Sequence, residues 1–283
     1  MNATLSELPG SAAQRLADWC RGRTRLVVLT GAGCSTDSGI PDYRDQAGQW
    51  KRRPPVQQRD FVGQHAVRQR YWARSLLGWR HFAKAQPNDA HRALARLEDA
   101  GHLHHLITQN VDGLHQQAGS RAVTDLHGRL DEVECLSCKA RIPRGAMQQS
   151  LETRNPEWSA LSAAHAPDGD ADLEGRDFTR FDVPACESCG GVLKPAVVFF
   201  GDSIPAAYTR EALDQVQRAD ALLVVGSSLM VWSGFRLVRE AAERGIAVAA
   251  LNLGVTRADG LLHLKLTAPC GDTLRDAAAA LGA

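Results

Sequence analysis

The chain has 283 residues, 44% of them hydrophobic and 23% charged, which is the composition of an ordinary globular protein. The net charge of +1, from 33 basic and 32 acidic residues, excludes attachment to nucleic acid by bulk charge and leaves only a local patch for that purpose. The 7 cysteines are an odd number, so a complete set of intramolecular disulfides is excluded. No run of about eighteen apolar residues occurs, and we expect no membrane-spanning helix.

The N-terminal segment predicts a short amphipathic helix. Leu5, Leu8, Leu16 and Trp19 fall on one face of it, with arginines nearby. Acidic residues interrupt these first turns, so the segment lacks the apolar core of a secretory signal. An arginine-bearing amphipathic segment also fits a transit peptide. We favour a helix of the mature domain, because the first predicted strand starts near residue 25.

Four short apolar runs predict strands that are buried on both faces of a parallel sheet. They are residues 25–30, 103–108, 221–225 and 246–251. Helical patterns lie between them, at 90–100, 209–219 and 232–244. Strands that alternate with helices predict an α/β fold with a Rossmann-like, doubly wound parallel sheet.

Glycines and small polar residues follow each predicted strand. Ligands of open α/β sheets bind beyond the carboxyl ends of the strands, so four such segments indicate one ligand site at that edge. The segments are Gly31-Ala32-Gly33-Cys34-Ser35, Gln109-Asn110-Val111-Asp112, Gly226-Ser227-Ser228 and Asn252-Leu253-Gly254.

Two long segments interrupt this alternation and predict a smaller lobe inserted into a nucleotide-binding lobe. The first is rich in Arg, Gln and aromatic residues, and the second carries two C-x-x-C pairs. We interpret the Ala/Asp/Pro-rich stretch 155–175 as a surface insertion. The predicted parts are a discontinuous nucleotide-binding lobe (1–44, 88–130 and 195–283), a helical cofactor-loop module (45–87) and a zinc-binding module (131–194).

The two pairs, Cys135 with Cys138 and Cys186 with Cys189, predict one structural zinc site. Four thiolates form a closed tetrahedral shell around Zn²⁺, with no open position for catalysis. The alternative is two redox dithiols or free thiols. We favour zinc, because two identical pairs flank one segment.

The turn Gly31-Ala32-Gly33 is by itself weak evidence for a nucleotide site. The usual dehydrogenase fingerprint needs a third glycine and an acidic residue roughly twenty positions later. Arg52 and Arg53 stand there instead, which disfavours a conventional dehydrogenase. Backbone N–H groups and Arg44 can nevertheless hold phosphates. His127, just before the cysteine-bearing segment, is either a general base near neutral pH or a packed histidine.

Taken together, these segments resemble the sirtuin (Sir2) family of NAD-dependent protein deacylases. The similarity runs in order from about residue 20 to 275, and it is closest to class II, the branch of mitochondrial sirtuin 4. The class II features are the segments 69–74, 166–170 and 189–194. The family motifs are the Gly-rich turn, Gly39-Ile-Pro-Asp-Tyr-Arg44, Thr108-Gln-Asn-Val-Asp-Gly-Leu-His115, His127-Gly128, both cysteine pairs, 193–201, 226–229 and 252–254.

The resemblance implies a role for each matching residue, with NAD and one structural Zn²⁺ as cofactors. His127 is the implied base, with Asn110 and Asp112 as its catalytic partners. Val198, Phe199 and Phe200 flank the implied acyl-lysine tunnel, and the partner is an acylated lysine of a protein. The implied NAD contacts are Gly31, Ala32, Gly33, Ser35, Asp42, Tyr43, Arg44, Gln109, Asn110 and Asp112 for the diphosphate, ribose and nicotinamide, and Gly226, Ser227, Ser228, Asn252, Gly254 and Cys270 for the adenosine half.

The implied activity is NAD-dependent removal of acyl groups from lysine, which gives nicotinamide, O-acyl-ADP-ribose and free lysine. Protein ADP-ribosyl transfer and a non-enzymatic NAD-sensing domain are the alternatives. A catalytic histidine argues against the last of these, since binding alone needs no base. We expect a bacterial cytoplasmic location, with the mitochondrial matrix as the alternative.

Tyr71 and Arg74 lead to the hypothesis of a specificity for acidic acyl groups. Three-residue spacing places both on one helix face, and class III sirtuins bind acidic acyl groups through a Tyr-x-x-Arg pair. The alternative is an arginine paired with a surface acid and a tyrosine packed under the helix. We favour the alternative, because the surrounding residues resemble class II.

Overall fold

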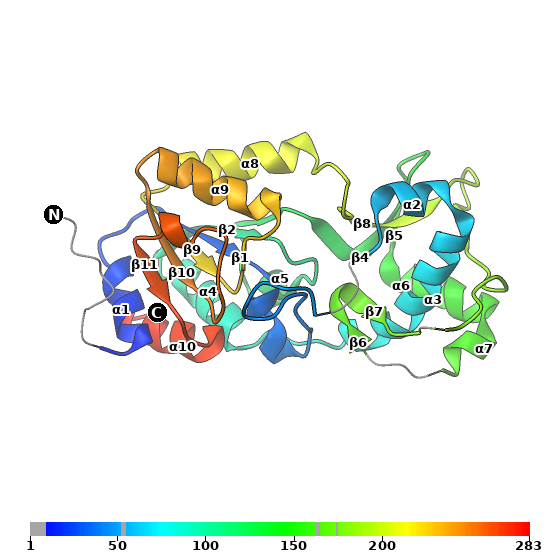
Figure 1. Cartoon of the computed structure of the whole chain (residues 1–283), viewed down its shortest axis with the longest axis horizontal. Coiled ribbons are helices and arrows are strands. Elements are labelled where there is room, and N and C mark those ends of the chain that lie inside the picture. Colours follow the sequence, from blue (N-terminus) through cyan, green and yellow to red (C-terminus); the bar gives the residue numbers. More distant parts are fainter. Residues whose placement is uncertain (1–9, 52–54, 162–164, 174) are drawn as a thin grey trace.

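The computed structural model describes residues 10–51, 55–161, 165–173 and 175–283, without the side chains of 165, 166 and 168. Leu5, Leu8, Arg52 and Arg53 therefore lie outside the described residues. Two lobes lie side by side along the long axis of the molecule, with both described ends of the chain in the larger lobe (Figure 1). Among the described residues, no helix is long and apolar enough to cross a membrane.

A six-stranded parallel sheet forms the centre of the larger lobe. Its strand order is β11 (Leu264–Leu266), β10 (Ala247–Leu251), β9 (Ala221–Val225), β1 (Leu26–Thr30), β2 (Leu103–Thr108) and β3 (Val123–Asp125). Every residue of β1 and β9 is buried, as expected for continuous apolar runs covered on both faces. The predicted doubly wound α/β fold is confirmed. The edge strands β3 and β11 were not predicted, because three residues carry too little periodicity.

Helices cover both faces of this sheet. On one face lie α1 (Ala12–Cys20), α4 (Asp89–Asp99) and α10 (Cys270–Leu281), and on the other α8 (Ala206–Gln217) and α9 (Trp232–Glu243), as Figure 1 shows. Ser11 caps α1 by accepting from the Gln14 N–H, which fixes where the helix starts. Leu16 and Trp19 are buried against α10 and the sheet, as expected for the apolar face of this helix.

The direction of strand addition reverses at β1. From β1 the chain adds β2 and β3 on one side, whereas β9, β10 and β11 follow on the other. The carboxyl ends of β1 and β9 therefore flank a switch point, where open α/β sheets leave a crevice for ligands. The turn 31–35 and the loop 226–228 follow these two strands directly.

The smaller lobe combines helices with short antiparallel strands around its own core. Its helices are α2 (Gln58–Gly63), α3 (His65–Phe82), α6 (Arg144–Arg154) and α7 (Pro156–Ser159). Its main sheet has the order β5 (Arg141–Pro143), β4 (Gly128–Cys135) and β8 (Leu193–Val197), and β6 (His165–Ala166) pairs with β7 (Asp170–Ala171). Strands β4 and β8 cross the predicted boundaries at 130 and 194, so they join the two lobes. The boundaries themselves stay predictions.

The interpretation of 155–175 as a surface insertion is wrong for part of its described residues. Trp158, Ala171 and Leu173 are buried in the core of the smaller lobe. The segment also packs directly on α3, because a Cβ atom at Gly78 would lie 2.2 Å from the Gly169 carbonyl oxygen. The prediction failed because it rested on composition, and the buried apolar residues of this stretch are few and widely spaced among polar ones.

Candidate active site

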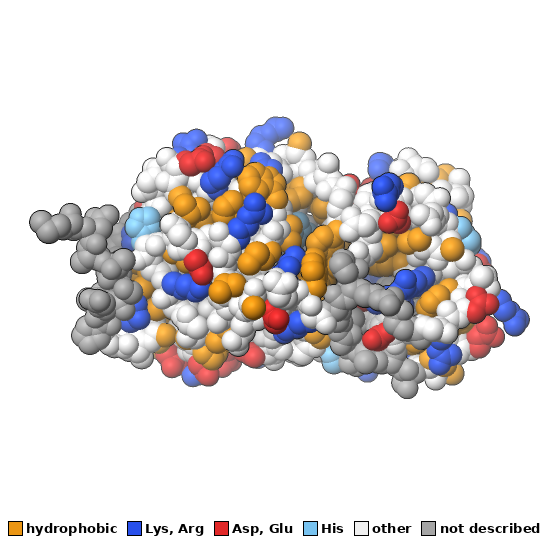
Figure 2. Space-filling model, in the orientation of Figure 1, with side chains coloured by type: hydrophobic (Ala, Val, Ile, Leu, Met, Phe, Trp, Pro, Cys, Tyr) orange, Lys and Arg blue, Asp and Glu red, His pale blue; other side chains and the backbone are white. Residues whose placement is uncertain are grey.

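A cleft of about 1430 Å³ lies between the two lobes, at the switch point of the sheet. On the face shown in Figure 2, apolar side chains gather where the lobes meet. Every residue predicted to contact NAD or the acyl-lysine lines this cleft. The structure therefore brings together residues that are more than two hundred positions apart in the chain. Their individual roles stay predictions.

Close backbone contact shapes the floor of the cleft. The Gly33 N–H donates to the Gly226 carbonyl over 2.8 Å, and the Gly31 N–H donates to the Val225 carbonyl over 3.0 Å. A Cβ atom at Gly33 would lie 2.9 Å from the Gly226 oxygen. Only glycines let the two turns approach this closely, which leaves the space above them for a dinucleotide. By this criterion the residues fit NAD.

Aromatic rings and one arginine form the wall beside residues 42–44. The Arg44 guanidinium lies 3.9 Å from the centre of the Trp50 ring and donates to the Gly48 carbonyl over 2.8 Å. Trp50 also contacts Tyr43 and Phe200 edge-to-face, at 6.0 and 5.7 Å between ring centres. Asp42 pairs with Lys51 at the same wall. Trp50 was missed in the sequence, where it is one aromatic residue in a polar loop.

A polar network links the first two strand ends. Ser35 Oγ donates to the Asp112 carboxylate over 2.7 Å, and the Asn110 amide donates to Ser35 Oγ and to the Gly31 carbonyl, each over 3.1 Å. Burial raises the pKa of Asp112, against hydrogen bonds from Leu114 and Ser35. The network leaves the Asn110 amide oxygen as an acceptor.

His127 is held between two elements of the larger lobe. Its Nδ1 lies 2.8 Å from the Gln109 carbonyl oxygen, and its Nε2 lies 2.8 Å from Ser233 Oγ, at the start of α9. Burial lowers the pKa of the imidazole, while the bond to Gln109 opposes that shift. Ser233 was missed. The available signal was its position two residues into the helix that follows the Gly226-Ser227-Ser228 loop.

The loops after β9 and β10 form the far half of the cleft. Ser227 Oγ accepts from the Gln109 side-chain amide over 2.8 Å, and the Asn252 amide donates to the Gly254 carbonyl over 3.0 Å. Ser228 lies beside them. Cys270, at the start of α10, is buried, which raises its thiol pKa to about 12. A neutral thiol suits a packing role here.

The segment 198–200 runs beside His127. The Val198 N–H donates to the His127 carbonyl over 2.8 Å, while the Phe200 carbonyl accepts from the Gln58 N–H over 2.9 Å. Phe199 points into the smaller lobe, where its ring lies 5.3 Å from Tyr71 and 5.1 Å from Phe61. This segment therefore connects the base with the wall that carries Tyr71.

The Arg74 guanidinium forms an ion pair with Asp170, which belongs to the segment 155–175. Its Nη2 lies 2.7 Å from Asp170 Oδ2, and its Nε lies 2.9 Å from Oδ1 of the same carboxylate. Tyr71 is packed among the rings of Phe61, Trp72 and Phe199. This agrees with the favoured alternative, except that the acid lies in the cleft and not on the surface. Asp170 was missed as a cleft residue, because its segment was interpreted as surface.

The four paired cysteines gather at the tip of β4, away from the cleft. Their Sγ atoms all lie within 4.8 Å of one another, with 3.5 Å between Cys135 and Cys189 and 3.7 Å between Cys138 and Cys186. No disulfide joins any of the four. Four sulfurs at these spacings fit the tetrahedral shell of one Zn²⁺, which would join the two halves of the module.

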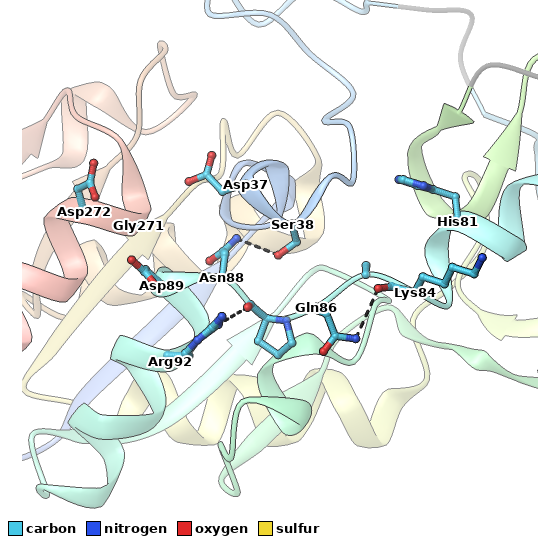
Figure 3. Close-up of a pocket in the computed structure, with 12 residues that line it drawn as sticks. Asp37, Ser38, His81, Lys84, Gln86, Asn88, Asp89, Arg92, Gly271 and Asp272 are labelled. Carbon is cyan, nitrogen blue, oxygen red and sulfur yellow. Dashed lines mark hydrogen bonds between the residues drawn. The ribbon is translucent and has the colours of Figure 1, made fainter.

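A second hollow, of about 580 Å³, lies on the other side of residue Asp37, which lines both spaces. Figure 3 shows Asp89 and Asp272 on one side of it and His81 and Lys84 on the other. Carboxylates and basic groups are mixed along its wall, so its charge selects no class of ligand.

Comparison with known proteins identifies the family. The model of the Sir2 family matches residues 31–233. A Bordetella bronchiseptica protein named NAD-dependent protein deacetylase is 56% identical over 276 residues, which cover 98% of this chain and 99% of the relative. This chain is a member of the Sir2 family. The resemblance noted in the sequence is thereby confirmed.

Further relatives of this sirtuin agree with the class II resemblance. NAD-dependent protein deacetylase 2 of Bradyrhizobium diazoefficiens is 60% identical, over 92% of this chain and 95% of the relative. The bovine protein named mitochondrial NAD-dependent protein lipoamidase sirtuin-4 is 50% identical, over 88% and 80%. A solved Sir2 protein with a p53 peptide and NAD⁺ is 30% identical, with a TM-score of 0.77 over 95% of this sirtuin and 98% of that chain.

Proposed function

We propose that the cleft removes acyl groups from lysine side chains of proteins with NAD as co-substrate, and that His127 is its general base. The deacetylases named among its relatives support this activity. The single observation that carries the assignment of the base is the position of one imidazole. It lies between the Gly-rich floor and the segment 198–200, with one nitrogen oriented by a backbone carbonyl.

When bound, NAD supplies a ribose carbon that the acyl oxygen attacks as nicotinamide leaves, and a ribose hydroxyl that must then lose its proton. His127 is suited to accept that proton, because its lowered pKa keeps the ring neutral near pH 7. Asn110 and Asp112 orient the ribose side of the cleft through their shared contact with Ser35. The expected products are nicotinamide, O-acyl-ADP-ribose and free lysine.

The wall beyond Val198 favours acyl groups longer than acetyl. Tyr71 and Phe199 present apolar rings there, and the Arg74 guanidinium is paired with Asp170. The lipoamidase name of the bovine relative supports the same choice. We propose a long neutral acyl chain as the preferred substrate class, and a bacterial cytoplasm as the location.

A panel of acetyl-, octanoyl-, lipoyl- and glutaryl-lysine peptides with NAD, followed by mass spectrometry, tests the proposal. We expect free lysine and O-acyl-ADP-ribose, with octanoyl or lipoyl peptide turned over best. His127→Ala should lower turnover by about 10²–10⁴-fold while NAD still binds. Transfer of ADP-ribose to protein without free lysine, or full turnover by the variant, would contradict the proposal.

A further inference from the structure

The tautomer of His127 follows from its two hydrogen bonds. A carbonyl oxygen can only accept, so Nδ1, which lies 2.8 Å from the Gln109 oxygen, must carry the proton of the neutral ring. Nε2 then holds the lone pair. The hydroxyl of Ser233, 2.8 Å away, must therefore donate to Nε2. The lone pair that a general base needs is engaged by a protein hydroxyl.

We propose that His127 receives the substrate proton through Ser233. This inference rests on the proposed deacylation and names a further catalytic residue for it. The O–H bond of the substrate hydroxyl breaks as its proton moves to Ser233 Oγ, and the original Ser233 proton moves to Nε2. The substrate oxygen becomes the nucleophile, Ser233 ends neutral, and the imidazolium carries the positive charge.

The position of Ser233 suits such a relay. It lines the cleft and is only partly buried, so its oxygen can accept a proton from a bound ligand. Its neighbour Gly234 fixes the helix against Gln109, since a Cβ atom at Gly234 would lie 2.7 Å from Gln109 Oε1. Gln109 thus has two roles: its backbone carbonyl orients Nδ1 of His127, and its side chain packs against α9, the helix that carries Ser233.

A simpler reading of the same contact is that the hydroxyl only covers Nε2 and must leave before catalysis. The two readings predict opposite effects of removing the hydroxyl. A covering group slows the base, so its removal accelerates product formation. A relay is required by the base, so its removal slows that step.

The experiment separates the two chemical steps in the full-length enzyme. Exchange of labelled nicotinamide into NAD with an acyl-lysine peptide reports the first step, and single-turnover formation of O-acyl-ADP-ribose reports the step that needs the base. Ser233→Ala should lower the second rate by about 10–100-fold and leave exchange within about twofold. Ser233→Thr keeps the hydroxyl, so its rate of O-acyl-ADP-ribose formation should be close to that of the wild type.

Two further measurements sharpen the test. In mixtures of H₂O and D₂O, the second step of the wild type should depend on two protons in flight, and that of Ser233→Ala on one. Glu243→Ala, an exposed position on the same helix, serves as the matched control and should change neither step.

Unchanged or faster product formation by Ser233→Ala would overturn the relay. An equal loss of both steps that Thr does not restore would overturn it in favour of a packing role. If the wild type performs neither step, the proposed deacylation itself has failed, which is a different outcome from a failure of the relay.

Discussion

Arg74 and Asp170 form a two-point contact between α3 and the inserted segment, with 2.7 Å from Nη2 to Oδ2 and 2.9 Å from Nε to Oδ1. The Arg74 guanidinium, the charged group of the Tyr-x-x-Arg pair, is thereby neutralised by the Asp170 carboxylate. An acidic acyl group would have to compete with that carboxylate for the same guanidinium.

Replacing the carboxylate should therefore change the acyl preference. Asp170→Asn keeps the shape and removes the negative charge, so kcat/KM for glutaryl-lysine relative to acetyl-lysine should rise by about tenfold, as expected for a charge-assisted contact. Asp182→Asn, which breaks an exposed pair with Arg154, is the control and should leave the ratio unchanged. An unchanged ratio in Asp170→Asn would show that Arg74 does not face the acyl group.

The pH profile should reflect the lowered pKa of His127. A base works in its neutral form, and burial shifts the pKa of this ring below its ordinary value of 6.5. The acidic limb of kcat/KM should therefore fall below pH 6.5, and activity should be nearly flat from there to pH 8. The measurement is kcat/KM for one acyl peptide between pH 5 and 9. A limb well above pH 6.5 would rule out this environment for the base.

Stability should fall on acidification because of a second buried histidine. His91 packs at 4.7 Å between ring centres from His115, and burial lowers its pKa to about 4. The unfolded chain takes up this proton near pH 6.5, whereas the folded chain does so only near pH 4. The contribution of His91 to stability is therefore lost as the pH falls through this window, by about 2 kcal/mol between pH 7 and 5.

Denaturant unfolding at pH 7 and pH 5 measures this effect. His91→Asn should show a smaller loss than the wild type, since asparagine does not titrate. His65→Asn, at an exposed position, should retain the full loss. Equal losses in His91→Asn and the wild type would assign the effect to other groups.

Zinc should contribute strongly to the stability of the smaller lobe. We expect one Zn²⁺ per chain by elemental analysis, and a fall of the melting temperature by about 10 °C on chelation. Cys138→Ser should lose the metal, whereas Cys20→Ala, in the core of the larger lobe, should keep it. Full metal content in Cys138→Ser would contradict the proposed site.

Gly226 should be essential for NAD binding. Its φ is +59°, and a Cβ atom there would lie 2.3 Å from the Cys34 backbone nitrogen. Gly226→Ala must push the two turns apart, so affinity for NAD should fall more than about tenfold, as strain of this kind costs a few kcal/mol. Gly145→Ala, which meets nothing within 4 Å, is the control. Calorimetric titration with NAD measures the affinity of both variants and the wild type. An unchanged affinity in Gly226→Ala would contradict the prediction.

The sequence allowed prediction of what is encoded locally. Three of the four central strands are almost entirely apolar, and β2 carries two histidines among its apolar residues. The residues that follow the four strands meet at one edge because parallel strands end there together. Contacts formed only by folding were not predictable. Ser233 reaches His127 across 106 positions, and Asp170 reaches Arg74 across 96. No pattern within either segment indicates its partner.

The pairing of β4 with β8 determines which parts of the chain can change in length without moving His127 relative to the segment 198–200. Gly128, next to His127, pairs with Val197, next to Val198, and Cys135 pairs with Leu193 near the other end. Strand register therefore sets the spacing between His127 and the segment 198–200, whereas the segment between the two cysteine pairs contributes no strand to this ladder. We expect that insertions and deletions at the exposed positions of that segment can alter which acyl chains are admitted while the ladder keeps its register.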